Sequence, residues 1–253
     1  MKAISLDQTL AVVTGAAGTM GRAVVASLAA QGCRVVMVDV DDQTLQAQRD
    51  RLGASVASRV STRVCDIRDA EQVARAHAGI AAELGRVDIL VNNAGVLSNH
   101  KIEATTLQEW RQVLAVNLDG AMFWSQNVVP AMKTAAWGRI INVGSLASKT
   151  GGLTAGTAYS VSKGALAALT FSLARELAPH GVTANAIAPA YVKTPMVTEQ
   201  LNEAQRQALL QQIPVGRFCE PEEFAHVVSF LASPLSGFIT GEIIDLNGGL
   251  QMD

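Results

Sequence analysis

The sequence is most constrained by a Val-rich segment, LAVVTG at 10–15, which a glycine-rich turn and an apolar helical stretch connect to a second Val-rich segment, RVVMVDV at 34–40. Near-continuous apolar runs of this kind are typical of parallel strands that are buried on both faces of a sheet. Similar segments recur along the chain: TRVCDIRD, VDILVNNAG, GRIINVGS, VTANAIAP and EIIDLNGG. About seven strands that alternate with helices predict an α/β fold, a doubly wound parallel sheet with helices on both faces.

The turn after the first strand contains Gly15, Gly18 and Gly21, at the start of a helical stretch. Glycines let the backbone approach a pyrophosphate closely, and the free N–H groups and dipole at the start of a helix attract its charge. A glycine turn between a Val-rich strand and a helix therefore predicts a Rossmann-type dinucleotide site, in preference to a purely structural turn.

Asp39 ends the second strand, 18 residues after Gly21. At about this spacing, an acidic side chain accepts hydrogen bonds from the adenosine ribose diol and repels a 2′-phosphate. At about 4 Å and an effective dielectric constant near 20, such a pair of like charges costs about 4 kcal/mol. Because no Arg or Lys directly follows Asp39, we expect NAD and not NADP. The alternative is that Asp39 is a solvated carboxylate in a turn.

Composition excludes several other classes of protein. The 253 residues are 49% hydrophobic and 17% charged, which suits one domain over residues 1–253 with a large core. A net charge of −2 gives no reason to expect a nucleic acid or anionic membrane partner. Cys33, Cys65 and Cys219 form no C-x-x-C motif, so zinc or redox chemistry is not expected. Because the N-terminus lacks a signal-peptide layout and no uncharged apolar stretch approaches roughly 20 residues, we expect a soluble, cytoplasmic protein.

Tyr159 and Lys163 lie in a long, nearly uncharged helical segment that is expected to run to about Pro179. Four positions apart, they share one face of a helix. A neighbouring cation favours the phenolate and lowers the pKa of the phenol, so the pair can exchange a proton near neutral pH. Such an exchange serves the interconversion of an alcohol and a carbonyl. Taken alone, the pair is also compatible with an ordinary amphipathic helix.

Several ordered motifs together resemble the short-chain dehydrogenase/reductase family, in its compact, single-domain branch. The resemblance spans nearly the whole chain, through TGAAGTMG, Asp39, CDI at 65–67, NNAG at 92–95, Asn117, Ser145, YSVSK and PAYVKT at 189–194. The glycine turn departs from that branch. Thr19 stands where the middle glycine is expected, and the spacing T-G-x-x-G-x-x-G resembles the extended branch instead.

The resemblance implies a catalytic role for four residues. Tyr159 would be the general acid/base, and Lys163 would lower its pKa and bind the nicotinamide ribose. Ser145 would hydrogen-bond the reacting oxygen, and Asn117 would hold a helix geometry and a water that links Lys163 to solvent. Hydride would pass directly between substrate and nicotinamide, so no metal is expected.

The resemblance also implies a set of cofactor contacts. Asp66 and Ile67 would meet adenine, and Val192 and Thr194 the nicotinamide amide. Thr19, or the backbone near it, would reach the pyrophosphate. The other expected contacts are Gly15, Gly18, Met20, Gly21, Asp39, Asn93, Ala94, Gly95, Tyr159, Lys163 and Pro189.

The expected substrate side of the site contains polar and basic residues: Asn99, His100, Lys149, Thr150, Tyr191 and Lys193. With NAD, they favour oxidation of a small hydroxylated substrate in carbohydrate metabolism, such as a sugar acid whose carboxylate meets a Lys. Ser145, Lys149, Tyr159 and Tyr191 are the expected substrate contacts, beneath a lid around 190–215 that contains the polar helix 198–212.

Two alternatives stay open. One is a reductase of 3-oxoacyl thioesters of acyl carrier protein or CoA, against which Asp39 argues because biosynthetic reduction generally draws on NADPH. The other is a catalytically inactive binding module of the same fold. Family members commonly pair the helix that contains GALAALTFSLARELA at 164–178, so the resemblance also implies a homo-oligomer, with a tetramer favoured.

Overall fold

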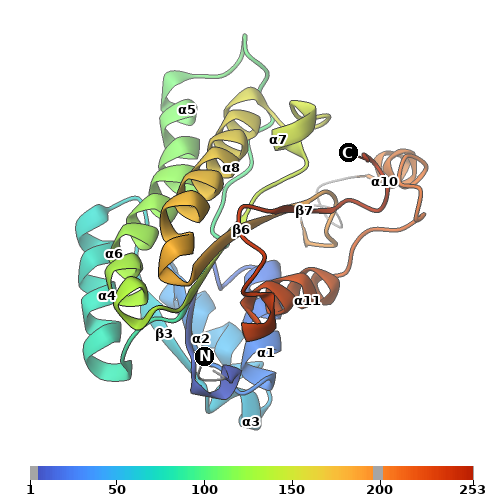
Figure 1. Ribbon diagram of the computed structural model, residues 1–253. Helices are drawn as coiled ribbons and strands as arrows, with labels where there is room; N and C mark the ends of the chain where they lie inside the picture. Colours follow the sequence, from blue (N-terminus) through green and yellow to red (C-terminus); the bar gives the residue numbers. More distant parts are fainter. Residues whose placement is uncertain (1–4, 196–201, 253) are drawn as a thin grey trace.

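A parallel sheet forms the centre of the molecule. The computed structural model describes residues 5–195 and 202–252. Within them, seven strands form one sheet in the order β3-β2-β1-β4-β5-β6-β7, and each neighbouring pair is parallel. The strands are β1 (Leu10–Thr14), β2 (Arg34–Asp39), β3 (Val60–Val64), β4 (Ile89–Asn92), β5 (Gly138–Val143), β6 (Val182–Pro189) and β7 (Ile243–Leu246). The predicted doubly wound, Rossmann-type α/β fold is confirmed (Figure 1).

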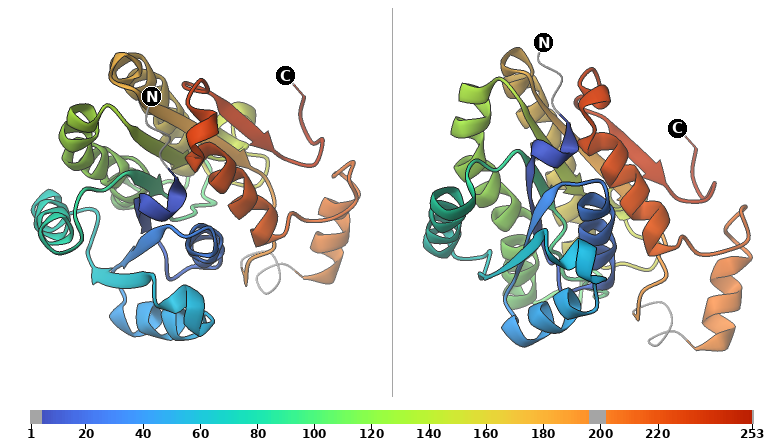
Figure 2. Two further views of the ribbon diagram at one scale, coloured as in Figure 1. Left: turned by 60° about the horizontal axis from the view of Figure 1, so that its bottom comes forward. Right: turned by 90° about the horizontal axis from the view of Figure 1, so that it is seen from below.

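Helices cover both faces of the sheet. The longer ones are α1 (Thr19–Ala30), α2 (Asp42–Asp50), α4 (Ala70–Leu84), α5 (Leu107–Leu114), α6 (Gly120–Ala135), α8 (Thr157–Leu177), α10 (Glu203–Leu210) and α11 (Pro221–Ala232). The shorter ones are η1 (Leu6–Gln8), α3 (Ala54–Ala57), the π-helical turn η2 (Ala115–Asp119), α7 (Ala147–Thr150), η3 (Ala178–His180) and η4 (Pro234–Ser236). In Figure 2, α1 and α11 lie on one side of the sheet, and α4, α6 and α8 on the other.

The alternation of side chains along the strands builds one apolar core on each face of the sheet. In β1, Ala11 and Val13 belong to the buried cluster that includes residues of α1 and α11, whereas Leu10 and Val12 belong to the cluster that includes residues of α4, α6 and α8. All five residues of β1 are buried. The Val-rich runs are therefore needed because both faces of the central strands are covered.

A line of polar side chains crosses the otherwise apolar interior. Asn92 of β4 and Asn142 of β5 are paired in register, and Asn92 Nδ2 donates to Asn142 Oδ1 at 2.8 Å. Asn142 Nδ2 in turn donates to Thr170 Oγ1 of α8 at 2.9 Å. All three residues are buried. These bonds join two central strands and the helix that contains the Tyr159 and Lys163 pair.

The strand order places the crevice of the fold at the carboxyl ends of β1 and β4. From β1 the chain winds outward to β2 and β3, and it then returns to β4 on the other side of β1. In such a sheet, ligands bind where the winding direction reverses. The glycine turn follows β1, and residues 93–95 follow β4, so both border this crevice.

The helix predicted to run to about Pro179 is α8, which ends at Leu177 and continues as η3. Within the expected lid at 190–215, residues 196–201 lie outside the described part of the chain, and α10 covers the middle of the expected polar helix. The lid and the single-domain assignment stay predictions. Among the described helices, none is both long and apolar enough to cross a membrane.

Candidate active site

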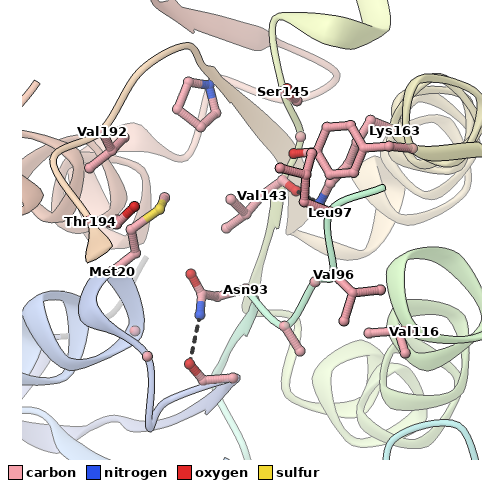
Figure 3. A pocket seen from close by; sticks show the side chains of 18 of the residues that line it. Met20, Asn93, Val96, Leu97, Val116, Val143, Ser145, Lys163, Val192 and Thr194 are labelled. Atoms are coloured by element: carbon pink, nitrogen blue, oxygen red, sulfur yellow. Dashed lines mark hydrogen bonds between the residues drawn. The ribbon is translucent and has the colours of Figure 1, made fainter. Parts of the chain in front are cut away.

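A cavity of about 740 Å³ opens at the carboxyl ends of the strands. It is lined by residues that follow β1, β2, β3, β4, β5 and β6, together with the first turns of α1 and α8. All the expected cofactor contacts line it: Gly15, Gly18, Thr19, Met20, Gly21, Asp39, Asp66, Ile67, Asn93, Ala94, Gly95, Tyr159, Lys163, Pro189, Val192 and Thr194. Residues up to 179 positions apart in the sequence, from Gly15 to Thr194, thus meet in one cavity (Figure 3).

The glycine turn is tightly packed beneath this cavity. Gly15 has a φ of +63°, and a Cβ added at Gly21 would lie 2.4 Å from the carbonyl oxygen of Gly15. Asn93 holds the turn in place, since its Nδ2 donates to Thr14 O at 2.9 Å and to Gly15 O at 3.1 Å (Figure 3). Gly18 is the N-cap of α1, so the free N–H groups of the helix start beside the cavity.

Asp39 occupies the cavity wall at the end of β2. Its carboxylate accepts hydrogen bonds from the backbone N–H of Ala17 at 3.1 Å and of Val40 at 2.8 Å, which fix its position beside the glycine turn. Arg68, which the sequence analysis missed, lines the same cavity. Its guanidinium holds both carboxylate oxygens of Asp66, at 2.9 and 2.6 Å, and lowers the pKa of Asp66. The sequence signal that could have identified Arg68 as a cavity residue is its position after β3, the strand that pairs with β2.

Ser145, Tyr159 and Lys163 meet at the other end of the cavity, as the sequence predicts. Ser145 follows β5, and its Oγ accepts a hydrogen bond from the backbone N–H of Ala147 at 3.1 Å. The Ser145 side chain also acts on the Tyr159 phenol and favours a lower pKa there. Lys163 Nζ donates to Val143 O at 2.7 Å and lies 5.7 Å from the centroid of the Tyr159 ring.

The expected lowering of the Tyr159 pKa is not found. Burial raises the pKa of this phenol, and the Ser145 side chain only partly opposes that effect. Burial also lowers the pKa of Lys163 to about 8. Sequence spacing correctly placed the two side chains on one helix face, but it did not account for the loss of water around both of them, which disfavours the phenolate and the ammonium alike.

Asn117 lies in the π-helical turn η2, behind the cavity wall. Its Nδ2 donates to Val96 O and to Ser162 Oγ, both at 3.0 Å, and its Oδ1 accepts from the backbone N–H of Val96 at 2.8 Å. Asn117 therefore joins the loop after β4 to α8, beside Lys163. A helix geometry held by Asn117, which the sequence analysis anticipated, agrees with this π-helical turn.

These residues fit a nicotinamide dinucleotide. Gly15 and Gly21 leave no room for a Cβ, whereas a Cβ at Gly18 would have only one neighbour within 4 Å, Gly15 O at 3.4 Å, so the turn is open on one side. Free helix N–H groups suit the pyrophosphate, and the fixed carboxylate of Asp39 suits a ribose diol. Among the described residues, no group of three His, Cys, Asp or Glu side chains could hold a metal ion.

Comparisons with known proteins agree with this geometry. Residues 15–251 match the family model described as Enoyl-(Acyl carrier protein) reductase. The chain is 36% identical to the 3-oxoacyl-[acyl-carrier-protein] reductase FabG of Aquifex aeolicus, over 98% of this chain and 99% of the relative. The corresponding protein of Escherichia coli is 37% identical, over 98% of this chain and 100% of the relative.

Another relative, the short-chain reductase protein NovJ of Streptomyces niveus, is 40% identical over 96% of this chain and 94% of its own. A solved structure, the crystal structure of gox2181, superposes with a TM-score of 0.91 at 34% identity, over 97% of this chain and 96% of that chain. This chain belongs to the short-chain dehydrogenase/reductase family. The enzyme is accordingly a nicotinamide-dependent oxidoreductase that acts on CH–OH or C=O groups.

The substrate side of this dehydrogenase/reductase differs from the sequence expectation. Lys149, an expected substrate contact, is absent from the cavity wall and forms an ion pair with Asp245 of β7 at 2.6 Å. Lys193 pairs with Glu220, and His100 pairs with Glu109 at 2.8 Å on the protein surface. Asn99 is exposed and also absent from the wall. Of the six residues expected there, Thr150 and Tyr191 line the cavity.

Apolar side chains that the sequence analysis missed form much of this wall instead. Val96, Leu97, Val116, Leu146 and Leu153 line the cavity. Figure 3 shows Val96, Leu97 and Val116 on the side of the cavity where Lys163 lies. Their contribution was hidden because they come from the loop after β4, from η2 and from the segment before α8, which have no common motif.

The loop after β4 also fixes the start of α8. Lys101 Nζ donates to the carbonyl oxygens of Gly152 at 2.9 Å and Ala155 at 2.6 Å. The backbone N–H of Gly156 donates to Ser98 O at 2.6 Å. Because Tyr159 lies in the first turn of α8, these bonds position both the cavity wall at Ala155 and the reacting phenol.

Proposed function

We propose that this enzyme interconverts 3-oxoacyl and 3-hydroxyacyl thioesters by hydride transfer with NAD(H). The observation that carries the proposal is the apolar wall of Val96, Leu97, Val116 and Leu153 in the cavity that contains Ser145 and Tyr159. An acyl chain buries methylene groups against such a wall at a gain of about 0.8 kcal/mol each. The names of the relatives support the same substrate class.

The sugar-acid substrate lacks support. It was inferred from a polar and basic set of substrate-side residues that could include a lysine for the carboxylate, and the ammonium of Lys149 is bound by Asp245. Lys193, a basic residue at the start of the expected lid, is paired with Glu220 at 3.0 Å. We therefore prefer the thioester, the alternative that the sequence left open.

The proposed cofactor is NAD, because the carboxylate of Asp39 is fixed by two backbone N–H groups at the adenosine end of the cavity. The nicotinamide would accept or supply the hydride at the opposite end, beside Ser145 and Tyr159. Arg68 is held by Asp66, so its charge is largely compensated.

The chain's own residues would manage the proton and the developing charge. In reduction, Tyr159 donates its phenolic proton to the substrate oxygen, and in oxidation it takes the proton back. Ser145 donates a hydrogen bond to the same oxygen, with a geometry fixed by the N–H of Ala147. Lys163 would compensate the phenolate, and Asn117 would connect Lys163 to solvent through a water.

The assembly proposed is a homo-oligomer, with a tetramer favoured, of single-domain chains that act on a small-molecule substrate under a lid at 190–215. Val161 and Phe171 on the outer face of α8 are 44% and 51% exposed, which supports a partner helix there. Sedimentation at micromolar concentration tests the assembly, and a monomeric mass would contradict it.

Turnover tests the function directly. Purified enzyme should oxidise NADH with acetoacetyl and 3-oxooctanoyl thioesters of N-acetylcysteamine, and Tyr159→Phe should abolish this turnover. Sugar acids and polyols with NAD form the comparison panel. Activity on a sugar acid alone, or thioester turnover that survives in Tyr159→Phe, would refute the proposal.

A further inference from the structure

A second, smaller cavity of about 140 Å³ lies next to the active-site cavity. The residues around it come from the segment after β6, the end of β7 and the residues that follow it, the segment between α10 and α11, and the first turn of α11. Tyr191 lines both cavities, and it is the residue that they have in common. Tyr191 therefore lies at the boundary between the cavity that contains Ser145 and Tyr159 and the second cavity.

Backbone hydrogen bonds define the walls of this second cavity. Tyr191 O accepts from the N–H of Cys219 at 3.0 Å, and the N–H of Lys193 donates to Cys219 O at 2.8 Å. On the other side, the N–H of Val215 donates to the carbonyl oxygen of Gly248 at 3.1 Å. The cavity is thus bordered by three segments joined by backbone hydrogen bonds, and it is open to solvent beside Val215, which is 59% exposed.

The polar groups of the second cavity are already satisfied by the protein. Arg217 donates to both carboxylate oxygens of Glu223, at 2.6 and 2.7 Å, so the two charges compensate each other. Asn247 donates to Gln251 O and accepts from the N–H of Gly249, both at 2.9 Å. A carboxylate or phosphate would therefore find no unpaired cation among the described residues of this wall.

Apolar side chains remain to meet a ligand there: Ile213, Val215 and Leu246, together with the Tyr191 ring. In volume alone, the second cavity is similar to engineered apolar cavities of about 150 Å³, which bind benzene. The second cavity is therefore suited to a hydrocarbon group of roughly six carbons. It is too small for a thioester carrier or a nucleotide.

We propose that the second cavity receives the distal end of an acyl chain, and that Tyr191 controls the chain length that the enzyme accepts. This inference rests on the proposed thioester substrate. A short chain fits within the active-site cavity, whereas a longer chain passes the Tyr191 ring, which packs edge-on against Phe218 with centroids 6.3 Å apart. Because each buried methylene group is worth about fourfold in binding, the effect grows with chain length.

The test compares 3-oxooctanoyl with acetoacetyl N-acetylcysteamine in the intact enzyme. In Tyr191→Ala, the ratio of the two kcat/KM values should rise at least about tenfold. Tyr191→Phe, which keeps the ring, should leave the ratio unchanged. Adding Val215→Trp to Tyr191→Ala should fill the second cavity and reverse the rise. Tyr191→Val provides the same comparison should the alanine variant not fold.

A binding measurement separates this inference from the proposed function. Calorimetry with octanoyl and acetyl N-acetylcysteamine requires no turnover, and the octanoyl thioester should bind Tyr191→Ala about tenfold more tightly than the wild type. An unchanged octanoyl affinity and an unchanged kcat/KM ratio would overturn the role of Tyr191. Tighter octanoyl binding without turnover of any thioester would support the second cavity and overturn the proposed reaction.

Discussion

Replacement of Asp39 by Asn should remove most of the proposed preference for NADH over NADPH. Asp39 is half-buried, and the N–H groups of Ala17 and Val40 prevent its carboxylate from turning away from the cavity. A 2′-phosphate bound there would lie at about 4 Å, where repulsion costs about 1 kcal/mol in water and about 4 kcal/mol at an effective dielectric constant of 20. Asn keeps the size of the side chain and removes its charge.

The expected change is therefore a factor of roughly five to several hundred in the ratio of kcat/KM values for NADH and NADPH. The assay is the initial rate with each cofactor at a fixed 3-oxoacyl thioester concentration. Asp42→Asn is the matched control, because the Asp42 carboxylate is bonded to Gln46 on α2 at 3.1 Å and is absent from the cavity wall. The reasoning fails if wild-type enzyme uses NADPH as well as NADH, or if Asp39→Asn leaves the ratio unchanged.

Three further variants probe the packing, the protonation and the positioning of the site. Gly21→Ala should lower the free energy of unfolding by about 1–3 kcal/mol in chemical denaturation, because its Cβ would meet Gly15 O at 2.4 Å. In the control Gly18→Ala, the nearest contact of the added Cβ is 3.4 Å, so this variant should be as stable as the wild type, and an equal loss of stability in both variants would contradict the prediction. Burial lowers the pKa of Lys163 from 10.5 to about 8, so between pH 8 and pH 10.5 this proton is held by the unfolded chain and not by the folded one. The free energy of unfolding of the wild type, measured relative to that of Lys163→Met, should therefore rise with pH over this range, and a difference that does not change with pH would refute the prediction. Lys101→Met should raise KM for the thioester about fivefold without changing KM for the cofactor, because this variant loses two hydrogen bonds to the loop on the substrate side. The control Lys133→Met breaks a surface ion pair with Glu176 and should change neither KM value.

The elements of the fold and the cofactor side of the site could be predicted because their signals are local. A Val-rich strand needs burial on both faces, a glycine turn needs room for its backbone, and Tyr159 and Lys163 need only the period of a helix. Each of these constraints acts within a few residues of sequence. The expected cofactor residues therefore line one cavity.

The substrate side could not be predicted because it depends on contacts between distant segments. Lys149 looks available in the sequence, but its partner Asp245 is 96 positions away on β7. Arg68 becomes part of the cavity only because β3 is the neighbour of β2. The net pKa shifts of Tyr159 and Lys163 follow from burial, which spacing along one helix does not report.

The polar line from Asn92 through Asn142 to Thr170 also bears on how the chain finds its sheet. Parallel pairing is slow to form, because strands distant in sequence must meet before any contact is gained. A misaligned β4–β5 pair would leave amides without partners in an apolar interior, at a cost of roughly 1–3 kcal/mol for each lost partner. The hydrogen bond between the directly opposed Asn92 and Asn142 would therefore favour the correct alignment of β4 and β5 over misaligned pairings. Because Asn142 also donates to Thr170 of α8, the helix of Tyr159 and Lys163 completes these hydrogen bonds only on a sheet with the correct strand alignment.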